Sequence, residues 1–328
     1  MKRRRVVAGI AFGTLLGAAY VLERSLARRW RAGEDELTAA GLSMPDVAHH
    51  FVPTDDGARI HVVESGTGPA IVLIHGITLG VGVWARQFRD LTDRHRVIAF
   101  DQRGHGQSIG GSGGYSFERL ADDLLTVLEH RQVTDAVVVG HSMGGMVLQL
   151  AALRRAEALA RHTSGIVLLA TDAGPAIPGP VGRPMGTVTG RMAGRAARFA
   201  ERRGKGVYPG SDLATWGARV CFGSQPRAAD VELVRSISVG VSPRAMAELL
   251  IPLLAFDVRA ELVNIELPTL VVVGTRDLVT PARRARAMAE RIPKAELEVL
   301  AGCGHLVMLE RPDALASILD RFSAQRVA

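Results

Sequence analysis

The sequence predicts an α/β fold: a doubly wound, mostly parallel sheet with an inserted, mainly helical cap. Short runs of β-branched and other apolar residues recur along the chain, and segments with helical patterning separate them. Strands of a parallel sheet that is covered on both faces are apolar throughout rather than alternating. A long break in this alternation before the last strands predicts the cap.

The predicted elements follow this pattern in chain order. Two extended runs on either side of Asp55-Asp56-Gly57 predict a hairpin at the start. The buried strands are expected at Ala70–Ile74, Val97–Phe100, Ala136–Val139, Ile166–Leu169 and Leu270–Val273, and a further extended run lies at Leu297–Leu300. Helices are expected at Phe117–His130 and Gly145–Leu159.

The chain divides into four predicted segments. Residues 1–32 form an N-terminal hydrophobic segment, 33–171 the first part of the core, 172–256 the cap and 257–328 the second part of the core. The first half of the cap is rich in Gly, Pro and Arg, and the second half, "SPRAMAELLIPLLAF", predicts a helix. Its apolar residues cover more than one face, so we expect two or three of them to pack onto the sheet core and the others to meet an acyl chain, a lipid surface or another cap helix. They are Met246, Leu249, Leu250, Ile251, Leu253 and Leu254.

The N-terminal segment has the features of a secretory signal or a membrane anchor. A basic run, "MKRRR", precedes a mostly apolar stretch of 17 residues at positions 6–22. As a helix they would span about 26 Å, against a hydrocarbon core of about 30 Å. We therefore expect residues 1–32 to bring the protein to or across a membrane. A cleaved signal and a retained anchor both stay open, as do both orientations, and an amphipathic surface helix is the alternative.

The basic charge does not indicate a nucleic-acid partner. The net charge is +7, but residues 1–31 alone carry eight Lys or Arg against one Glu. Aromatic residues make up only 5% of the chain, which leaves no platform for stacking bases. Two cysteines, Cys221 and Cys303, define neither a disulfide framework nor a metal site. The sequence gives no indication of the oligomeric state.

The pentapeptide Gly-x-Ser-x-Gly occurs twice, at 140–144 and at 110–114. Only the first copy follows a predicted strand and opens a predicted helix, which is the setting that exposes a nucleophilic serine at the carboxyl end of a sheet. An N-cap serine would explain Ser142 but not the paired glycines. We therefore predict Ser142 as the nucleophile and Ser112 as part of a loop.

A serine nucleophile needs a base, and that base needs an orienting carboxylate. His305 follows the extended run at Leu297–Leu300, and Asp277 directly follows the strand "LVVVG". Both would therefore lie at the same edge of the sheet as Ser142. Asp172, after the strand at Ile166–Leu169, is the alternative acid, and Asp257 is a weaker one.

The turn after His75-Gly76 predicts an oxyanion hole. The backbone N–H groups of Ile77 and Met143 are the expected donors. His75 and His105 are expected to hold loops through hydrogen bonds. His141 is expected to pack or to bond locally.

These motifs together resemble the α/β-hydrolase family of lid-bearing serine hydrolases, and they cover residues 48–325. The matching pieces are His75-Gly76 with Trp84 downstream, Asp101-x-Arg103-Gly104-x-Gly106-x-Ser108, Gly140-His141-Ser142-Met143-Gly144-Gly145, Gly274-x-x-Asp277 and Gly304-His305. Serine at position 142 argues against the dehalogenase and epoxide-hydrolase branches, which carry aspartate there.

The resemblance implies hydrolysis of a carboxylic ester, or a thioester, of a small or lipid-like substrate. The reaction would pass through an acyl-enzyme on Ser142 and would need neither a metal nor an organic cofactor. Related members act as cofactor-free peroxidases, carbon–carbon bond hydrolases or lyases with the same triad, and these remain alternatives. Residues 1–32 lie outside the family core.

Overall fold

The computed structural model describes residues 41–175 and 212–326. Residues 1–32 therefore lie wholly outside the described residues, and most of the first half of the predicted cap does too. Within the described part, one eight-stranded sheet has the order β1-β2-β4-β3-β5-β6-β7-β8. Its strands are β1 (Ala48–Pro53), β2 (Arg59–Ser65), β3 (Ala70–Ile74), β4 (Arg96–Phe100), β5 (Ala136–His141), β6 (Thr163–Leu169), β7 (Thr269–Gly274) and β8 (Ala295–Leu300).

The sheet is mostly parallel, as the sequence predicts. Strands β3 to β8 pair in parallel, while β1 pairs with β2 and β2 with β4 in antiparallel fashion. The hairpin predicted around Asp55-Asp56-Gly57 joins β1 to β2, and Gly57 adopts the positive φ of 82° that its turn requires. The parallel strands place their carboxyl ends along one edge.

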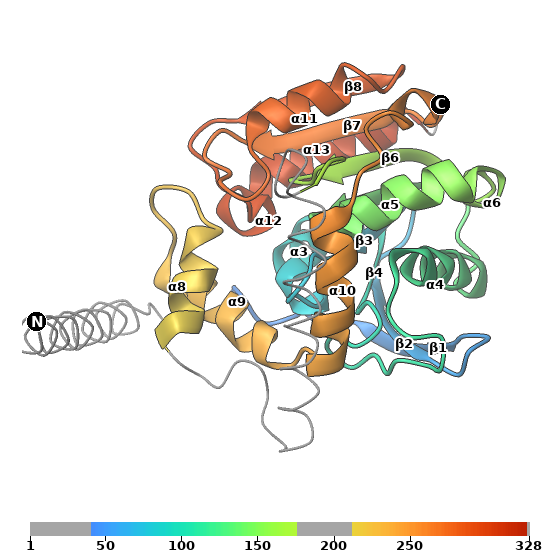
Figure 1. Cartoon of the computed structure of the whole chain (residues 1–328), viewed down its shortest axis with the longest axis horizontal. Coiled ribbons are helices and arrows are strands. Elements are labelled where there is room, and N and C mark those ends of the chain that lie inside the picture. The colour runs from blue at the N-terminus through green and yellow to red at the C-terminus, as the bar shows by residue number, and fades with distance from the viewer. Residues whose placement is uncertain (1–40, 176–211, 327–328) are drawn as a thin grey trace, which may run out of the picture.

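Helices and short 3₁₀ turns connect and cover the strands (Figure 1). They are η1 (Val81–Trp84), α3 (Ala85–Leu91), α4 (Phe117–His130), α5 (Met143–Arg154), α6 (Ala156–Ala160), α8 (Asp212–Val220), α9 (Ala228–Val239), α10 (Pro243–Ala255), η2 (Leu262–Asn264), α11 (Ala282–Ala289), α12 (Val307–Glu310) and α13 (Pro312–Ala324).

Two apolar cores lie on the opposite faces of the sheet. In β3, Val72 and Ile74 join the core that contains α4, α5 and α11, while Ile71 and Leu73 join the core that contains α3 and α13. Because successive side chains of a strand point to opposite faces, an entirely apolar strand serves both cores. This is the doubly wound arrangement that the apolar runs predict.

One helix boundary differs from its prediction. The helix expected at Gly145–Leu159 begins at Met143, and it is broken at Arg155, where φ is −134° and ψ is 33°. A residue with these dihedrals cannot continue an α-helix, so α6 is a separate short helix. The apolar periodicity runs on across the break, which is why the sequence pattern did not show it.

The segment between β6 and β7 contains α8, α9 and α10 in its described part. Helix α10 corresponds to the helix expected in "SPRAMAELLIPLLAF", and Ser242 caps it by accepting a hydrogen bond from the Ala245 N–H. Among the described helices, none is by itself long and apolar enough to cross a bilayer; α9 and α10 qualify only together, as a pair bent by 104°.

Candidate active site

Ser142 stands on a sharp turn between β5 and α5. Its backbone has φ 52° and ψ −119°, a conformation that a residue with a side chain seldom adopts and that costs about 1–3 kcal/mol. A Cβ atom on Gly140 would lie 2.6 Å from the Gly144 carbonyl oxygen, and one on Gly144 would lie 2.7 Å from the carbonyl oxygens of Ile74 and His75. The two glycines are therefore sterically required. Ser142 makes no side-chain capping bond to α5, which removes the N-cap explanation.

His305 and Asp277 meet at the carboxyl edge of the sheet. The His305 Nδ1 atom lies 2.9 Å from the Asp277 Oδ2 atom. Asp277 also accepts hydrogen bonds from the Val279 and Thr280 N–H groups at 2.8 and 2.7 Å, and from the Thr280 hydroxyl at 2.7 Å. Burial alone would raise the pKa of Asp277, but the charge on His305 and these hydrogen bonds lower it overall. The carboxylate is therefore ionised at neutral pH and holds the Nδ1–H tautomer of His305.

Ser142 and His305 line the same cavity, which has a volume of about 170 Å³. The Ser142 hydroxyl makes no hydrogen bond to His305 within the described chain; such bonds often tighten only when substrate binds. Most of the remaining lining is apolar and comes from the loops at the carboxyl edge of the sheet and from α5, α9 and α10. These side chains are Ile77, Leu79, Met146, Val234, Leu253, Val279 and Leu306.

The two expected oxyanion donors are close to this cavity: Ile77 lines it, and Met143 directly follows Ser142, which also lines it. Ile77 lies two residues after the buried His75. Met143 is the first residue of α5, and the first N–H groups of a helix have no intrahelical partner and carry partial positive charge. An oxyanion formed at Ser142 would therefore lie close to the amino end of α5.

His75 fixes the turn that carries Ile77. Its Nδ1–H donates to the Gly76 carbonyl oxygen at 2.7 Å, while its Nε2 accepts from the Gln102 N–H at 2.9 Å. This pattern requires a neutral ring, in agreement with burial, which lowers the pKa of His75. His105 is also buried, which lowers its pKa to about 3, and its Nδ1 lies 3.2 Å from the Arg103 carbonyl oxygen. Both contacts match the loop-holding roles expected for these histidines.

His141 packs directly against His305. The ring centroids are 4.8 Å apart, and the His141 Nε2–H donates to the His305 carbonyl oxygen at 3.0 Å. Burial holds the pKa of His141 well below its ordinary value. The neutral His141 ring therefore packs beside the His305 imidazole and adds no positive charge there.

The motif at 101–108 holds the loops next to the site in place through hydrogen bonds and ion pairs. Asp101 accepts hydrogen bonds from His61 Nδ1 at 2.8 Å and from the Val81 N–H at 2.8 Å. The fully buried Arg103 pairs with Asp56 and Asp123. These contacts tie the loops that follow β3 and β4 to the antiparallel hairpin.

The alternative acids, Asp172 and Asp257, and the second candidate serine, Ser112, make other interactions. The Asp172 carboxylate accepts from its own neighbours Ala173 N–H and Gly174 N–H at 2.8 and 3.1 Å, and it pairs with Arg284. Asp257 pairs with Arg259 through both oxygens. Ser112 lies in an exposed loop, where its hydroxyl donates to the Asp56 carbonyl oxygen at 3.1 Å. The structure thus pairs Asp277 with His305 beside the cavity that Ser142 lines. Asp172 also lines that cavity, but its carboxylate is engaged with Arg284 and with the N–H groups of its neighbours.

Sequence reasoning missed Glu310, which connects the histidine loop to the segment after α8. Its carboxylate accepts from the Gly304 N–H at 2.9 Å and from the Gly223 N–H at 2.8 Å. Next to these bonds, the His305 N–H donates to the Cys221 carbonyl oxygen at 2.7 Å. A Cβ atom on Gly304 would lie 2.3 Å from the Gly223 nitrogen, so the two backbones pack in direct contact. In the sequence, only the short spacing from Gly304-His305 to Glu310 could have drawn attention to this residue.

The described residues contain no group of three or more His, Cys, Asp or Glu side chains that could hold a metal ion. The site as built consists of a serine on a strained turn, a histidine–aspartate pair and a helix amino end. These are the parts of an acyl-transfer centre.

The α/β-hydrolase fold family model matches residues 69–312, and the chain belongs to this family. A non-heme chloroperoxidase from Kitasatospora aureofaciens is 30% identical over 272 residues, covering 77% of this chain and 90% of the relative. A pimeloyl-[acyl-carrier protein] methyl ester esterase from Nitrosomonas europaea is 28% identical, covering 80% and 99%. The crystal structure of a hydrolase from Pseudomonas aeruginosa is 29% identical with a TM-score of 0.70, covering 84% and 97%.

Proposed function

We propose that the protein is a serine hydrolase that cleaves a carboxylic ester or thioester. The 2.9 Å contact between His305 Nδ1 and Asp277 Oδ2 carries this proposal, because His305 lines the same cavity as Ser142. Ser142 attacks the carbonyl carbon as His305 takes the hydroxyl proton. His305 then gives that proton to the leaving alcohol or thiol, and the acyl-enzyme forms. His305 next activates a water, which releases the acid and restores Ser142.

The backbone N–H groups of Ile77 and Met143 are assigned to the oxyanion. Each such donor typically supplies about 2.7–4 kcal/mol of transition-state stabilisation. The apolar lining of the cavity favours an acyl group of small or lipid-like character over a polar one. The methyl ester esterase relative supports an ester over other acyl derivatives.

The test is covalent labelling combined with turnover. Purified protein is treated with a fluorophosphonate, and its hydrolysis of p-nitrophenyl esters is followed. We expect one adduct, on Ser142, and loss of both labelling and turnover in Ser142→Ala. Ser112→Ala is the matched control and keeps both. An adduct on Ser112, or full turnover by Ser142→Ala, contradicts the proposal.

A cofactor-free peroxidase is the second candidate, because a chloroperoxidase relative matches this chain at 30% identity. In that reaction the acyl-enzyme on Ser142 is attacked by hydrogen peroxide instead of water, which yields a peroxy acid. Halide oxidation that requires both peroxide and a carboxylic acid, and that exceeds ester hydrolysis, would favour it. Carbon–carbon bond hydrolysis and lyase chemistry remain alternatives that use the same triad.

We further propose that residues 1–32 bring the enzyme to a membrane or carry it across one. The basic run followed by apolar residues 6–22 supports this, and both lie outside the family match, which begins at residue 69. Residues 172–256 are proposed as the cap over the site. In that arrangement the substrate is a small or lipid-like ester that reaches Ser142 beneath α10.

A further inference from the structure

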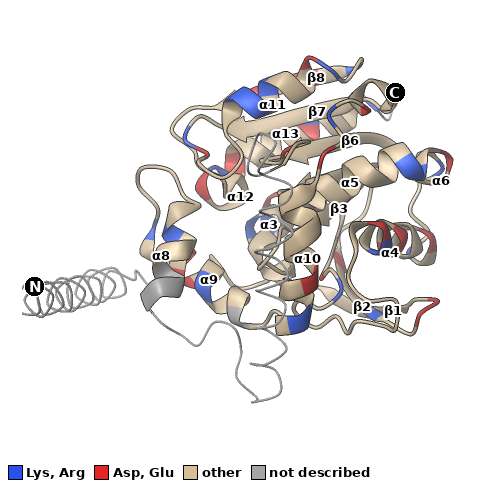
Figure 2. Cartoon of the chain, in the orientation of Figure 1, with Lys and Arg blue, Asp and Glu red and all other residues tan. Residues whose placement is uncertain are grey.

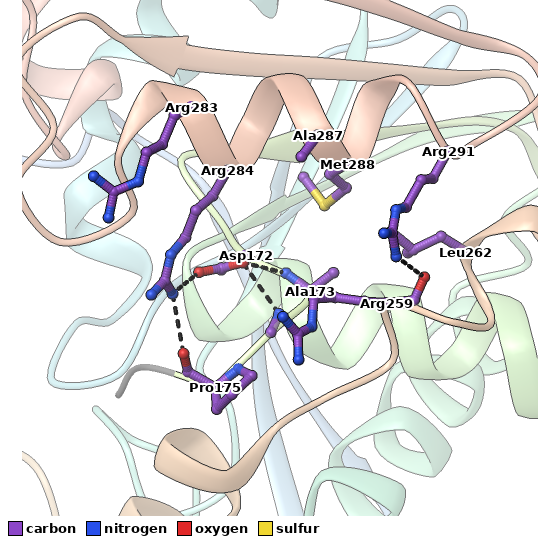
Figure 3. A pocket seen from close by; sticks show the side chains of 11 residues that line it. Asp172, Ala173, Pro175, Arg259, Leu262, Arg283, Arg284, Ala287, Met288 and Arg291 are labelled. Carbon is purple, nitrogen blue, oxygen red and sulfur yellow. Dashed lines mark hydrogen bonds and ion pairs between the residues drawn. The ribbon is translucent and has the colours of Figure 1, made fainter. Parts of the chain in front are cut away.

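A second cavity, of about 380 Å³, adjoins the cavity of Ser142 (Figure 3). The two cavities share Asp172, Gly174 and Arg284 as lining residues, so they adjoin at these residues. The lining of the second cavity contains four arginines, which are Arg259, Arg283, Arg284 and Arg291. Asp172 is its single acidic lining residue among those described.

Two of the four arginines are neutralised within the protein. Arg284 pairs with Asp172 and also donates to the Pro175 carbonyl oxygen at 3.1 Å. Arg259 forms two hydrogen bonds of 2.8 Å with Asp257. These contacts fix the wall of the cavity and contribute no net charge to it.

The other two arginines carry uncompensated charge. Over the described ranges 41–175 and 212–326, neither Arg283 nor Arg291 forms an ion pair. Arg291 donates one N–H to the Arg259 carbonyl oxygen at 3.0 Å, and its remaining donors are available. Helix α11 carries Arg283 near its start, and Arg291 follows its end. Figure 3 shows the two side chains toward opposite ends of the cavity, and Figure 2 shows the basic residues along α11.

We propose that this arginine cavity binds an anionic group, a carboxylate or a phosphate, on the substrate whose ester reacts at Ser142. This inference rests on the proposed hydrolase function. A planar guanidinium matches the oxygens of either anion with two parallel hydrogen bonds. Leu262, Ala287 and Met288 give the cavity an apolar side that can contact the methylenes joining the anion to the ester. Arg284 would mark the passage from one cavity to the other.

The test compares anionic esters with neutral esters of matched chain length. Monomethyl suberate is compared with methyl octanoate, and 1-octanoylglycerol 3-phosphate with 1-octanoylglycerol. The first pair tests a carboxylate and the second a phosphate. We expect the anionic member of one pair to have a kcat/KM about tenfold above its neutral partner, the scale of one charge-assisted hydrogen bond.

The variant Arg283→Gln/Arg291→Gln should lose this preference and keep its kcat/KM for the neutral esters. Arg286→Gln is the matched control, because Arg286 is an exposed arginine on α11 that does not line the cavity. It should keep the preference. Equal turnover of both members in both pairs, or a preference that survives the double variant, overturns the anion site.

A binding measurement separates this site from the proposed chemistry. Isothermal titration calorimetry on Ser142→Ala, with and without the two glutamine substitutions, measures the affinity for monomethyl suberate and for 1-octanoylglycerol 3-phosphate. If the binding of one of them weakens about tenfold without the arginines, the anion site is supported even when no ester is hydrolysed. The lack of hydrolysis would contradict the proposed hydrolase function and not the anion site. Affinities that are unchanged by the substitutions overturn the site.

Discussion

Asp277 and Asp172 both follow strands at the carboxyl edge of the sheet, yet their surroundings differ. Asp277 faces His305, and the Thr280 hydroxyl that donates to Asp277 also lies 3.3 Å from His305 Nδ1. Asp172 faces Arg284 and its own backbone neighbours. This geometry supports Asp277, rather than Asp172, as the residue proposed to orient His305.

We therefore predict that Asp277→Asn lowers kcat by about 10⁴-fold, because an amide stabilises the wrong imidazole tautomer. Asp172→Asn should keep most of the wild-type kcat. Steady-state kinetics with a p-nitrophenyl ester measures both. A large loss in Asp172→Asn together with a small one in Asp277→Asn would transfer the role to Asp172.

Three buried histidines near the site should make the fold sensitive to acid. The pKa values of His75, His105 and His141 are all lowered from 6.5 by burial. Below pH 6.5 the unfolded chain takes up these protons and the folded chain does not. Their contribution to stability is therefore complete above that pH and is lost as pH falls, down to a pH of about 3 for His105.

His105→Gln isolates one of these contributions. Each such histidine should steepen the pH dependence of the unfolding free energy by about 1.4 kcal/mol per pH unit. Urea denaturation at several pH values between 4 and 7.5 should thus give a shallower slope for His105→Gln than for wild type. Parallel slopes would show that His105 accepts a proton in the folded protein.

At the scale of elements, α12 and the segment after α8 hold His305, the proposed general base, from two sides. Glu310, at the end of α12, bonds Gly304 and Gly223 with its two oxygens. Glutamine offers one carbonyl oxygen in place of two, so Glu310→Gln leaves one of these amides without its acceptor. An unsatisfied buried donor costs about 1–3 kcal/mol.

We predict that Glu310→Gln lowers kcat about tenfold or more while KM changes little, since the residue touches the histidine loop and does not line the acyl cavity. Glu290→Gln, an exposed change on the surface beside α11, is the control. An effect confined to the unfolding free energy, with kcat unchanged, would limit Glu310 to a structural role.

Helix α10 contributes Leu253 to the cavity that contains Ser142. The sequence pattern singled out six apolar residues of this helix. In the structure Leu249 is buried, and Leu250 and Leu254 are half-buried without lining that cavity. Only a three-dimensional placement could separate Leu253 from its neighbours.

Leu253→Ser should therefore lower kcat/KM for medium acyl chains more than for acetyl. Each methylene that leaves water is worth about 0.8 kcal/mol. The measurement is a kcat/KM profile over p-nitrophenyl esters of increasing acyl length, with Leu250→Ser as the matched control. If both variants keep the wild-type profile, α10 does not form the acyl site.

At the scale of the whole molecule, the sequence predicted the sheet and the edge on which the site lies. The apolar strands identified the layers, and Ser142, Asp277 and His305 each follow one of them. The break at Arg155 depends on one residue's dihedrals, and the Gly223–Glu310 contact joins positions 87 residues apart. Local periodicity carries no information on either.

The N-terminal segment supplies a prediction for the full chain. We expect the full-length protein in the membrane fraction, or exported, and a chain that begins at Gly33 in the soluble fraction with its ester hydrolysis intact. Cell fractionation followed by activity assays checks both. Full-length protein found wholly in the soluble cytoplasm would contradict the targeting role of residues 1–32.

The direct packing of Gly223 against Gly304 has a consequence for the timing of the reaction. The His305 N–H donates to the Cys221 carbonyl oxygen, so the proposed general base shares a backbone hydrogen bond with the segment that follows α8. If α8 swings outward to admit a substrate, it must either break this bond or pull the imidazole away from Ser142. Substrate entry and ester cleavage would then alternate. While α8 is open, Ser142 would lack its base and would not react with an ester.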